Sequence, residues 1–362
     1  MLTKEDSQTL KGLAIILMLF HHLFLNKERF INFSGAYFPI NENLLINISI
    51  ACKICVSIFA FISGYGLYYS LESYSGGFFC WIKQHLIKTL SSFWFIALFF
   101  YGAVFLLNYF FNFYNCTLPS NNIFMNIIYI FLDIIGISNL INTFTLCGTW
   151  WYIGTAIFFI LISPLLYNLI KKYTFTILIL IALIPYIFKL GYPGGENTLT
   201  YLPIFGCGMY FANNKLFNKV TEYKISNNSI ISTIIKFTIL LGGGFVCIVI
   251  TMKTEMKKDN LWPVFYCVFP MIVILLCKLY IFKIVTIAKS LQFLGLHATN
   301  IWLCHTFIRE NLLRFYSYFP HFIICFLLLL LLSIILSFIF IGIRKILRYD
   351  NFINYLCKKC CK

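Results

Sequence analysis

Two residues near the start of the chain, Lys11 and His22, have the types and the spacing to do chemistry together. They are eleven positions apart, which in an α-helix is three turns and about 20°, so they share one face about 16 Å apart along the axis. The ring of His21 would point about 80° away from that face. A neutral imidazole can remove a proton from a hydroxyl, and a lysine can hold a phosphate as a point charge. The spacing indicates a base and an anion site on one helix, with an interfacial anchor as the alternative for Lys11.

A further histidine, His305, lies in the apolar segment LGLHATNIWLCHTFIRE. If the intervening segments cross a membrane in turn, His22 and His305 lie at comparable depth near its outer surface. A shared site would require this placement, and two unrelated interfacial histidines are the alternative. The acids expected nearest to this depth are Glu310 and Asp133, either of which could orient a base.

The composition excludes a water-soluble protein. Of the 362 residues, 60% are hydrophobic and only 11% are charged, whereas soluble domains have about 25% charged residues. The net charge of +16 would suggest a nucleic-acid partner in a soluble protein. Here the lysines fall in short loops between apolar segments, where they set orientation in a membrane. We therefore expect the protein to lie in a lipid bilayer and to bind no nucleic acid.

The elements that must position these residues are membrane-spanning helices, each needing about 20 largely apolar residues. The sequence predicts an all-α integral membrane protein, a polytopic bundle of about ten transmembrane helices. It forms a single domain, 1–362, with a short basic cytoplasmic tail at about 344–362. The predicted spans are 10–25, 45–69, 91–112, 149–170, 173–190, 199–213, 230–252, 261–282, 291–308 and 320–343. The segment 123–140 carries Asp133 and is interpreted as interfacial or re-entrant.

Loop charges favour ten spans over eleven. With both termini cytoplasmic, the inside loops hold most of the lysines and arginines, and Arg29 and Arg309 fall in the smaller outside set. An eleventh span would exchange the two sides of everything after Ile123 and place the basic C-terminal tail outside, against the usual distribution.

Six sequence blocks then support one another through their order. They are Lys11 with ten intervening residues and His22, VSIFAFISGYGLYYS, WIKQHLIKTLSSFW, GTWWYIGTAIFFILISPLL, LPIFGCGMYFA and LGLHATNIWLCHTF. In this order the chain resembles the type 3 membrane acyltransferase family, whose members acylate bacterial polysaccharides and other extracytoplasmic sugars. Lys11 stands where that family usually has arginine, so it keeps the charge without the bidentate fork.

The resemblance, read with the residues, assigns roles to eleven positions. The catalytic residues are expected to be His22 and His305, with His22 as the general base. The donor-binding residues are expected to be Lys11, Lys83 and Lys88, although charge-based orientation alone would also explain the last two. The acceptor or pore lining is expected to be His21, Lys53, Ser63, Trp151, Tyr152 and Glu310. The alternatives are snorkelling for Lys53 and an aromatic belt for Trp151 and Tyr152, together with the neighbouring Trp150. No metal site is expected.

The resemblance implies an O-acyltransferase in a bacterial plasma membrane. It would move an acyl group, with acetyl-CoA as the expected cytoplasmic acyl-CoA donor, to an extracytoplasmic polysaccharide or glycolipid. No bound cofactor is expected, and a homo-oligomer is compatible with the sequence. Direct transfer is the simpler path, with an acyl-His or acyl-Ser intermediate as the alternative. The rival function is a transporter or flippase that exports a glycan or an acyl metabolite.

Overall fold

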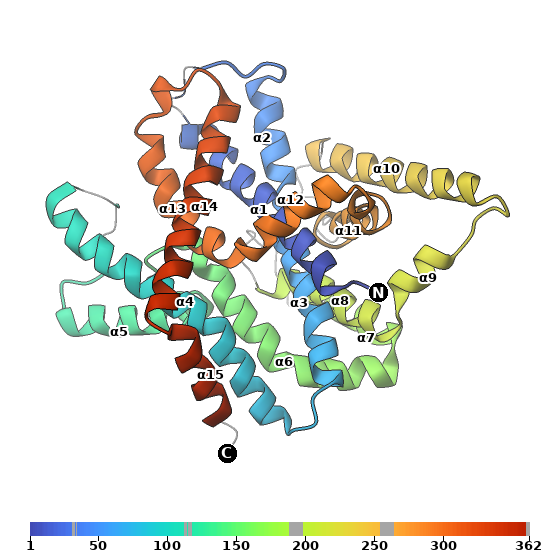
Figure 1. Cartoon of the computed structure of the whole chain (residues 1–362), viewed down its shortest axis with the longest axis horizontal. Coiled ribbons are helices and arrows are strands. Elements are labelled where there is room, and N and C mark those ends of the chain that lie inside the picture. Colours follow the sequence, from blue (N-terminus) through green and yellow to red (C-terminus); the bar gives the residue numbers. More distant parts are fainter. Residues whose placement is uncertain are drawn as a thin grey trace. The chain divides into compact units, whose positions relative to one another are not determined.

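The computed structural model describes residues 1–30, 33, 35–111, 114, 118–187, 198–253 and 264–359. Over these residues the long elements are all α-helices (Figure 1). They are α1 (Lys4–Phe24), α2 (Glu42–Ala51), α3 (Ile54–Glu72), α4 (Phe78–Phe111), α5 (Ile123–Ile134), α6 (Trp151–Tyr173), α7 (Phe175–Ile187), α8 (Leu202–Asn213), α9 (Leu216–Glu222), α10 (Ser229–Lys253), α11 (Phe269–Leu279), α12 (Val285–Leu296), α13 (Ala298–Leu313), α14 (Phe322–Ile346) and α15 (Tyr349–Lys359).

Seven helical segments in the described part of the chain are long and apolar enough to cross a membrane. They are Lys4–Phe24, Glu42–Glu72, Phe78–Asn108, Gly148–Tyr173, Ser229–Ile250, Phe265–Lys283 and Phe322–Ile346. Each coincides with one of the ten predicted spans, so the prediction of a helical membrane protein is confirmed.

The other three predicted spans, 173–190, 199–213 and 291–308, coincide with shorter helices. They are α7, α8 and the pair α12 and α13. A helix of 12 residues, such as α8, extends about 18 Å, less than the hydrocarbon thickness of about 30 Å. The same holds for α5, which has 12 residues and lies in the segment interpreted as interfacial. The count of ten and the cytoplasmic termini therefore remain predictions.

The chain divides into two compact units, each made of three stretches of sequence. The first unit is Met1–His21, Asn47–Ser73 and Ser163–Ala298, and the second unit is His22–Ile46, Tyr74–Ile162 and Thr299–Lys362. The prediction of a single domain is not tested by this division. Because the boundary falls between His21 and His22, the two adjacent histidines of α1 belong to different units.

In the first unit, two of the sequence blocks pack directly against each other. Helix α3 carries Gly64 and helix α8 carries Gly208. A Cβ atom on Gly64 would collide with the carbonyl oxygen of Phe205, and one on Gly208 would collide with that of Phe61. Small residues allow helix backbones to approach closely, which is a main source of helix association in membranes. Gly64 and Gly208 therefore serve the packing of α3 against α8.

Helix α1 is also held in the first unit by close packing at glycine residues. Gly12 of α1 lies against the backbone of Leu291, and Gly295 of α12 lies against the backbone of Gln8. Each helix thus presents a glycine to the other, which brings their backbones together. This close contact fixes the helix whose last turn carries His22.

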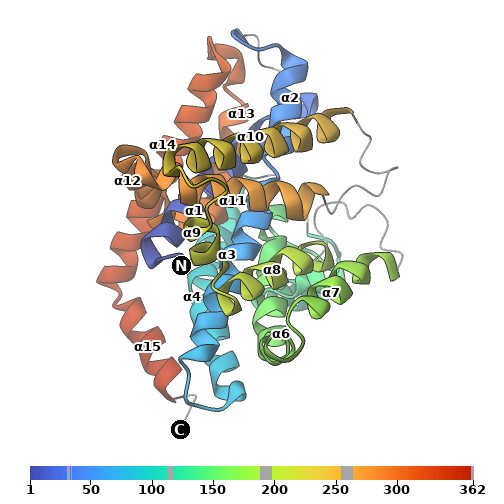
Figure 2. The same cartoon turned by 90° about the vertical axis from the view of Figure 1, so that its right-hand side faces the viewer.

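In the second unit, aromatic residues fill the core. The rings of Phe100 on α4 and Phe307 on α13 stack with centroids 3.8 Å apart and an interplanar angle of 6°. Most of the predicted basic tail, Tyr349–Lys359, forms α15, which packs beside α4 (Figures 1 and 2). There the hydroxyl of Tyr349 donates to the carbonyl oxygen of Ser91 at 2.8 Å. The second unit thereby anchors α13, the helix of His305.

Candidate active site

Two imidazole rings face each other in the second unit. His22 lies in the last turn of α1, and His305 lies in the middle of α13. Their ring centroids are 4.9 Å apart with an interplanar angle of 38°. The structure thus brings together the two residues that the sequence predicted as catalytic. His305 is fully buried, with 0% exposure, whereas His22 is half-buried. Of the two, His22 is the more exposed.

The hydrogen bonds of His305 define its protonation pattern. Its Nδ1 lies 2.7 Å from the carbonyl oxygen of Trp302. A carbonyl only accepts hydrogen bonds, so Nδ1 carries the proton in the neutral ring and Nε2 carries the lone pair. The hydroxyl of Thr306 lies 3.4 Å from this Nε2, and it shares a hydrogen bond of 2.9 Å with the hydroxyl of Thr149. His305 is therefore held in one orientation with a basic nitrogen toward two hydroxyls.

Two arginines converge on the backbone of His22. Helix α1 ends at Phe24, so the carbonyl of His22 is among the last four, which lack a partner within the helix. Arg29 donates to this oxygen through Nη1 at 2.8 Å, and Arg309 donates through its own Nη1 at 3.2 Å. The other terminal nitrogen of Arg309 pairs with Glu310 at 3.2 Å. The predicted lining residue Glu310 thus contacts an arginine of the site.

Neither arginine was expected at the site from the sequence, where Arg29 and Arg309 count only as outside loop charges. A signal for Arg309 is present nevertheless. It follows His305 by four positions in one helix, so the two side chains lie on one face. Arg29 offers no such signal, because it lies in the short 3₁₀ segment Lys27–Phe30 after α1.

The segment Gly148–Trp150 docks on α13 through two indole groups. The Nε1–H of Trp302 donates to the carbonyl of Thr149 at 3.1 Å. The Nε1–H of Trp150 donates to the carbonyl of Leu303 at 3.0 Å. These bonds place the hydroxyl of Thr149 at the helix turn that carries His305.

The predicted lining residues Trp151 and Tyr152 continue from this segment. Trp151 is buried, with 8% exposure, and Tyr152 packs edge-on against Trp302 with centroids 5.8 Å apart. Trp150 is 3% exposed. The belt interpretation requires aromatic rings that face lipid, so it is wrong for both tryptophans. These rings pack inside the second unit instead.

Asp133, considered from the sequence as an orienting carboxylate for a histidine, has a different environment. Its carboxylate accepts from the hydroxyls of Tyr101 at 2.7 Å and Ser138 at 2.8 Å, and from the backbone N–H of Leu146 at 2.9 Å. Three donors on a buried carboxylate make a satisfied network. Asp133 therefore fixes the loop that leads to Thr149.

His21, predicted to line the acceptor path, makes packing bonds in the first unit. Its Nδ1 lies 2.8 Å from the carbonyl oxygen of Ser49 on α2. In return, the hydroxyl of Ser49 donates to the carbonyl of His21 at 3.1 Å. The ring is buried, with 4% exposure. These reciprocal bonds join α1 to α2, which is a structural role.

Three further predicted residues lie in the first unit, and each is half-buried. Lys11 lies on α1 next to Gly12, Lys53 lies at the junction of α2 and α3, and Ser63 lies on α3. Ser63 directly precedes Gly64, the glycine that contacts α8. The proposed roles of Lys11, Lys53 and Ser63 remain predictions.

The predicted donor lysines Lys83 and Lys88 lie on α4 in the second unit, and both side chains are exposed. The ammonium of Lys83 lies over the ring of Phe79, 4.3 Å from its centroid. This cation–π contact stabilises the lysine near the start of the helix. Both cations are accessible to an anionic ligand.

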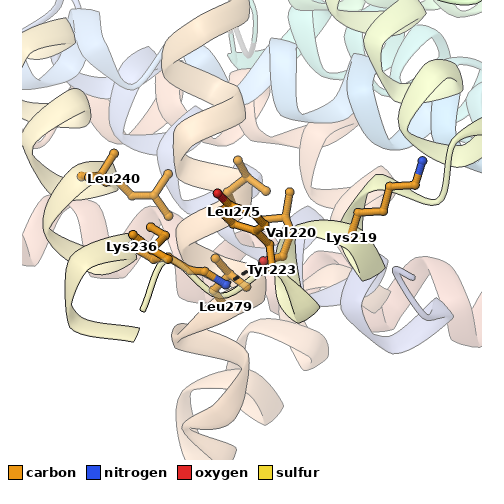
Figure 3. Close-up of a pocket in the computed structure, with 9 residues that line it drawn as sticks. Lys219, Val220, Tyr223, Lys236, Leu240, Leu275 and Leu279 are labelled. Atoms are coloured by element: carbon orange, nitrogen blue, oxygen red, sulfur yellow. Dashed lines mark hydrogen bonds between the residues drawn. The ribbon is translucent and has the colours of Figure 1, made fainter. Parts of the chain in front are cut away.

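A separate cavity of about 360 Å³ lies in the first unit (Figure 3). The ammonium of Lys236 donates to the carbonyl of Val220 at 2.9 Å, so it caps the end of α9. The cavity is lined by Lys219, Val220, Tyr223, Ile225, Lys236, Ile239, Leu240, Leu275 and Leu279. None of these residues was predicted for the site. The lining thus combines aliphatic side chains with two lysines and a tyrosine.

Comparison with known proteins places this geometry in a family. A family model described as an acyltransferase domain matches residues 6–342. No curated protein and no solved structure gives a significant match. The matched region includes both histidines, both arginines, every helix from α2 to α13 in full, and most of α1 and α14. With this match over most of its length, the chain belongs to the type 3 acyltransferase family.

Proposed function

We propose that this protein is a membrane-embedded O-acyltransferase that moves an acetyl group from cytoplasmic acetyl-CoA to a hydroxyl of an extracytoplasmic polysaccharide or glycolipid. The observation that carries the proposal is the contact between the rings of His22 and His305, 4.9 Å apart. Ionisable groups within membrane segments are costly and generally mark a functional site. Because the chain belongs to an acyltransferase family, acyl transfer is the reaction that we assign to this histidine pair.

In the proposed reaction, His22 is the general base because it is the more accessible ring. A sugar hydroxyl is a weak nucleophile, so it must lose its proton as it attacks the thioester carbonyl. The imidazole of His22 takes this proton while the C–O bond forms. The C–S bond then breaks, and the imidazolium returns the proton to the departing CoA thiolate. The products are an ester and free CoA, and no covalent enzyme intermediate is required.

His305 acts in this scheme as the partner that positions His22. Its ring is fixed by Trp302 and lies against the ring of His22. A base held in one orientation reacts faster because less motion must be arrested on the way to the transition state.

The donor and acceptor assignments follow the sequence predictions. Lys83 and Lys88 in the second unit remain candidates for binding the CoA phosphates, and their exposure supports this role. Lys11 in the first unit is a separate donor-binding candidate. Within the second unit, Trp151, Tyr152 and Glu310 are the acceptor-side candidates. Lys53 and Ser63 are the candidates from the first unit, while the bonds of His21 with Ser49 favour packing for that ring. The proposed location is a bacterial plasma membrane.

The test is acetyl transfer across a bilayer. Purified protein in liposomes would receive radiolabelled acetyl-CoA inside and cell-wall oligosaccharides outside. We expect label to become covalent on sugar with the wild type. His22→Ala should lower the rate by about 10²–10⁴-fold, the range for loss of a general base. His22→Ala protein must retain the wild-type melting temperature for this comparison.

The same assay examines the rival function, export of a glycan. If unmodified sugar crosses the bilayer and label never becomes attached to it, the acyltransferase proposal is wrong for this protein. No described contact favours transport specifically, since the paired imidazoles and the family match both concern acyl transfer.

A further inference from the structure

Arg309 is a buried cation with an unused hydrogen-bond donor. Its side chain is almost fully buried, and the residue is 8% exposed. Within the described residues, its Nε atom has no hydrogen-bond partner. A buried donor left without a partner costs about 1–3 kcal/mol. Such groups are rare in folded proteins. Because this one lies beside a candidate catalytic pair, a substrate atom is a natural acceptor for its hydrogen bond.

The other two nitrogens of Arg309 already have protein partners. Nη1 donates to the carbonyl of His22 at 3.2 Å, and Nη2 pairs with the carboxylate of Glu310 at 3.2 Å. A bidentate grip on a carboxylate would have to break one of these contacts. A single oxygen atom can bind at Nε without disturbing either. The ligand that fits is therefore a single acceptor oxygen and not a bidentate anion.

The position of Arg309 in the fold ties this donor to the reacting groups. It lies four residues after His305 on α13, so the two side chains share a face. Its guanidinium contacts the backbone of His22, whose ring faces His305. Arg29 donates to the same carbonyl oxygen at 2.8 Å, which adds a second positive charge nearby.

We propose that the Nε–H of Arg309 is the oxyanion-stabilising donor of the site, and this proposal rests on the acyltransferase function above. When the acceptor hydroxyl attacks, the electron pair of the thioester C=O moves onto its oxygen, which becomes an oxyanion. The Nε–H donates to that oxygen. As the C–S bond breaks, the electron pair returns and the C=O of the ester forms. Arg309 gains and loses no proton in the cycle.

The physical argument is that this donor is preorganised. Its contacts with His22 and Glu310 fix the guanidinium before substrate arrives, so little reorganisation is needed during the reaction. The burial of Arg309 excludes water, and a charge–charge interaction is stronger where water is excluded. Loss of one oxyanion donor in other enzymes lowers kcat by about 10²–10³-fold. We expect an effect of this size here.

The experiment compares two CoA analogues that differ in the atom under test. One is a methylphosphonothioate of CoA, which carries a tetrahedral centre with a charged oxygen. The other replaces the thioester sulfur of acetyl-CoA with a methylene group and so carries a ketone. Their dissociation constants would be measured with the full-length protein in nanodiscs. The wild type should bind the tetrahedral analogue at least about 10²-fold more tightly, as transition-state analogues do.

Arg309→Gln should reduce that preference by about 10²-fold while the affinity for the ketone changes little. Arg314→Gln is the matched control, because Arg314 is an exposed arginine on the same chain segment; its preference should equal that of the wild type. If Arg309→Gln does not fold, Arg309→Lys is the alternative, because it keeps a cation without an Nε–H. Its preference for the tetrahedral analogue over the ketone should be about ten-fold lower than that of the wild type.

Two results would overturn the assignment. One is an unchanged preference in the Arg309 variants, and the other is an equal fall in affinity for both analogues, which marks a purely structural role. Failure of the proposed function would look different, because the wild-type protein would then bind neither analogue or, as an exporter of an acyl metabolite, bind both without preferring the tetrahedral one.

Discussion

The Nδ1 atom of His305 lies 2.7 Å from the carbonyl oxygen of Trp302, one turn earlier in the same helix. This contact orients the ring and assigns its proton to Nδ1, which leaves Nε2 as the basic nitrogen. The two nitrogens therefore have separate tasks. Nδ1 holds the ring to its own helix, and Nε2 lies toward the hydroxyl of Thr306 at 3.4 Å.

The two tasks of His305 can be separated by amide substitutions. The amide of Asn reaches about as far as Nδ1, and that of Gln about as far as Nε2. We expect His305→Asn to keep the bond to Trp302 and the wild-type melting temperature, yet to lose acetyl transfer. We expect His305→Gln to lose the bond, at about 1 kcal/mol, and to melt at a lower temperature. Melting curves and transfer assays would be recorded together, and a His305→Gln protein more stable than His305→Asn would contradict the assignment.

A second prediction concerns the buried carboxylate of Asp133. Replacing it with Ala leaves three donors, on Tyr101, Ser138 and Leu146, without their acceptor. Each unmade buried bond costs about 1–3 kcal/mol, so Asp133→Ala should be among the most destabilising single changes in the second unit. Tyr101→Phe removes one donor together with its need for a partner, and it should cost less. Thermal unfolding in detergent measures the stability of both variants. If both melted at the wild-type temperature, the network would contribute little to stability.

The helical class and the individual residues of the histidine pair could be predicted from the sequence. Apolar length predicts spans, and the histidines are conspicuous because imidazoles are rare in such segments. Their contact could not be derived, because His22 and His305 lie on helices far apart in the sequence. Their contact depends on the tertiary packing of the second unit, which the sequence pattern does not show.

Other features could not be predicted for a different reason. Loop position made Arg29 and Arg309 look like orientation charges, although both donate to the last turn of α1. Sequence does not show where the unpaired carbonyls of a helix end will lie in space. Likewise, a tryptophan near a predicted membrane surface suits a belt and a core equally, and Trp150 is in the core.

A third prediction tests whether the charge of Lys11 serves the donor. Lys11 stands on the helix of His22 and is half-buried. Arginine keeps the charge and can bind phosphate, so Lys11→Arg should remain active. Lys11→Glu should be inactive, because a carboxylate repels the phosphates of CoA. Transfer rates would be measured over a range of acetyl-CoA concentrations. Equal activity of the two variants would remove Lys11 from the donor site.

The last prediction concerns the close contact between α3 and α8. Because a Cβ on Gly208 would collide with the carbonyl of Phe61, Gly208→Ala should force the helices apart and cost about 1–3 kcal/mol. Gly64→Ala should act similarly through Phe205. Gly66 is the matched control on α3, since a Cβ there meets nothing within 4 Å. Gly66→Ala should therefore leave the melting temperature unchanged or raise it slightly.

Combining the two substitutions tests the mechanism of this packing. Once the first added Cβ has separated α3 from α8, the second enters space that has already opened. The destabilisation of Gly64→Ala with Gly208→Ala should therefore be smaller than the sum of the single effects, as happens when two sites share one backbone shift. Additive losses would mean that each glycine acts on its own surroundings, and that the two helices do not move apart as a unit.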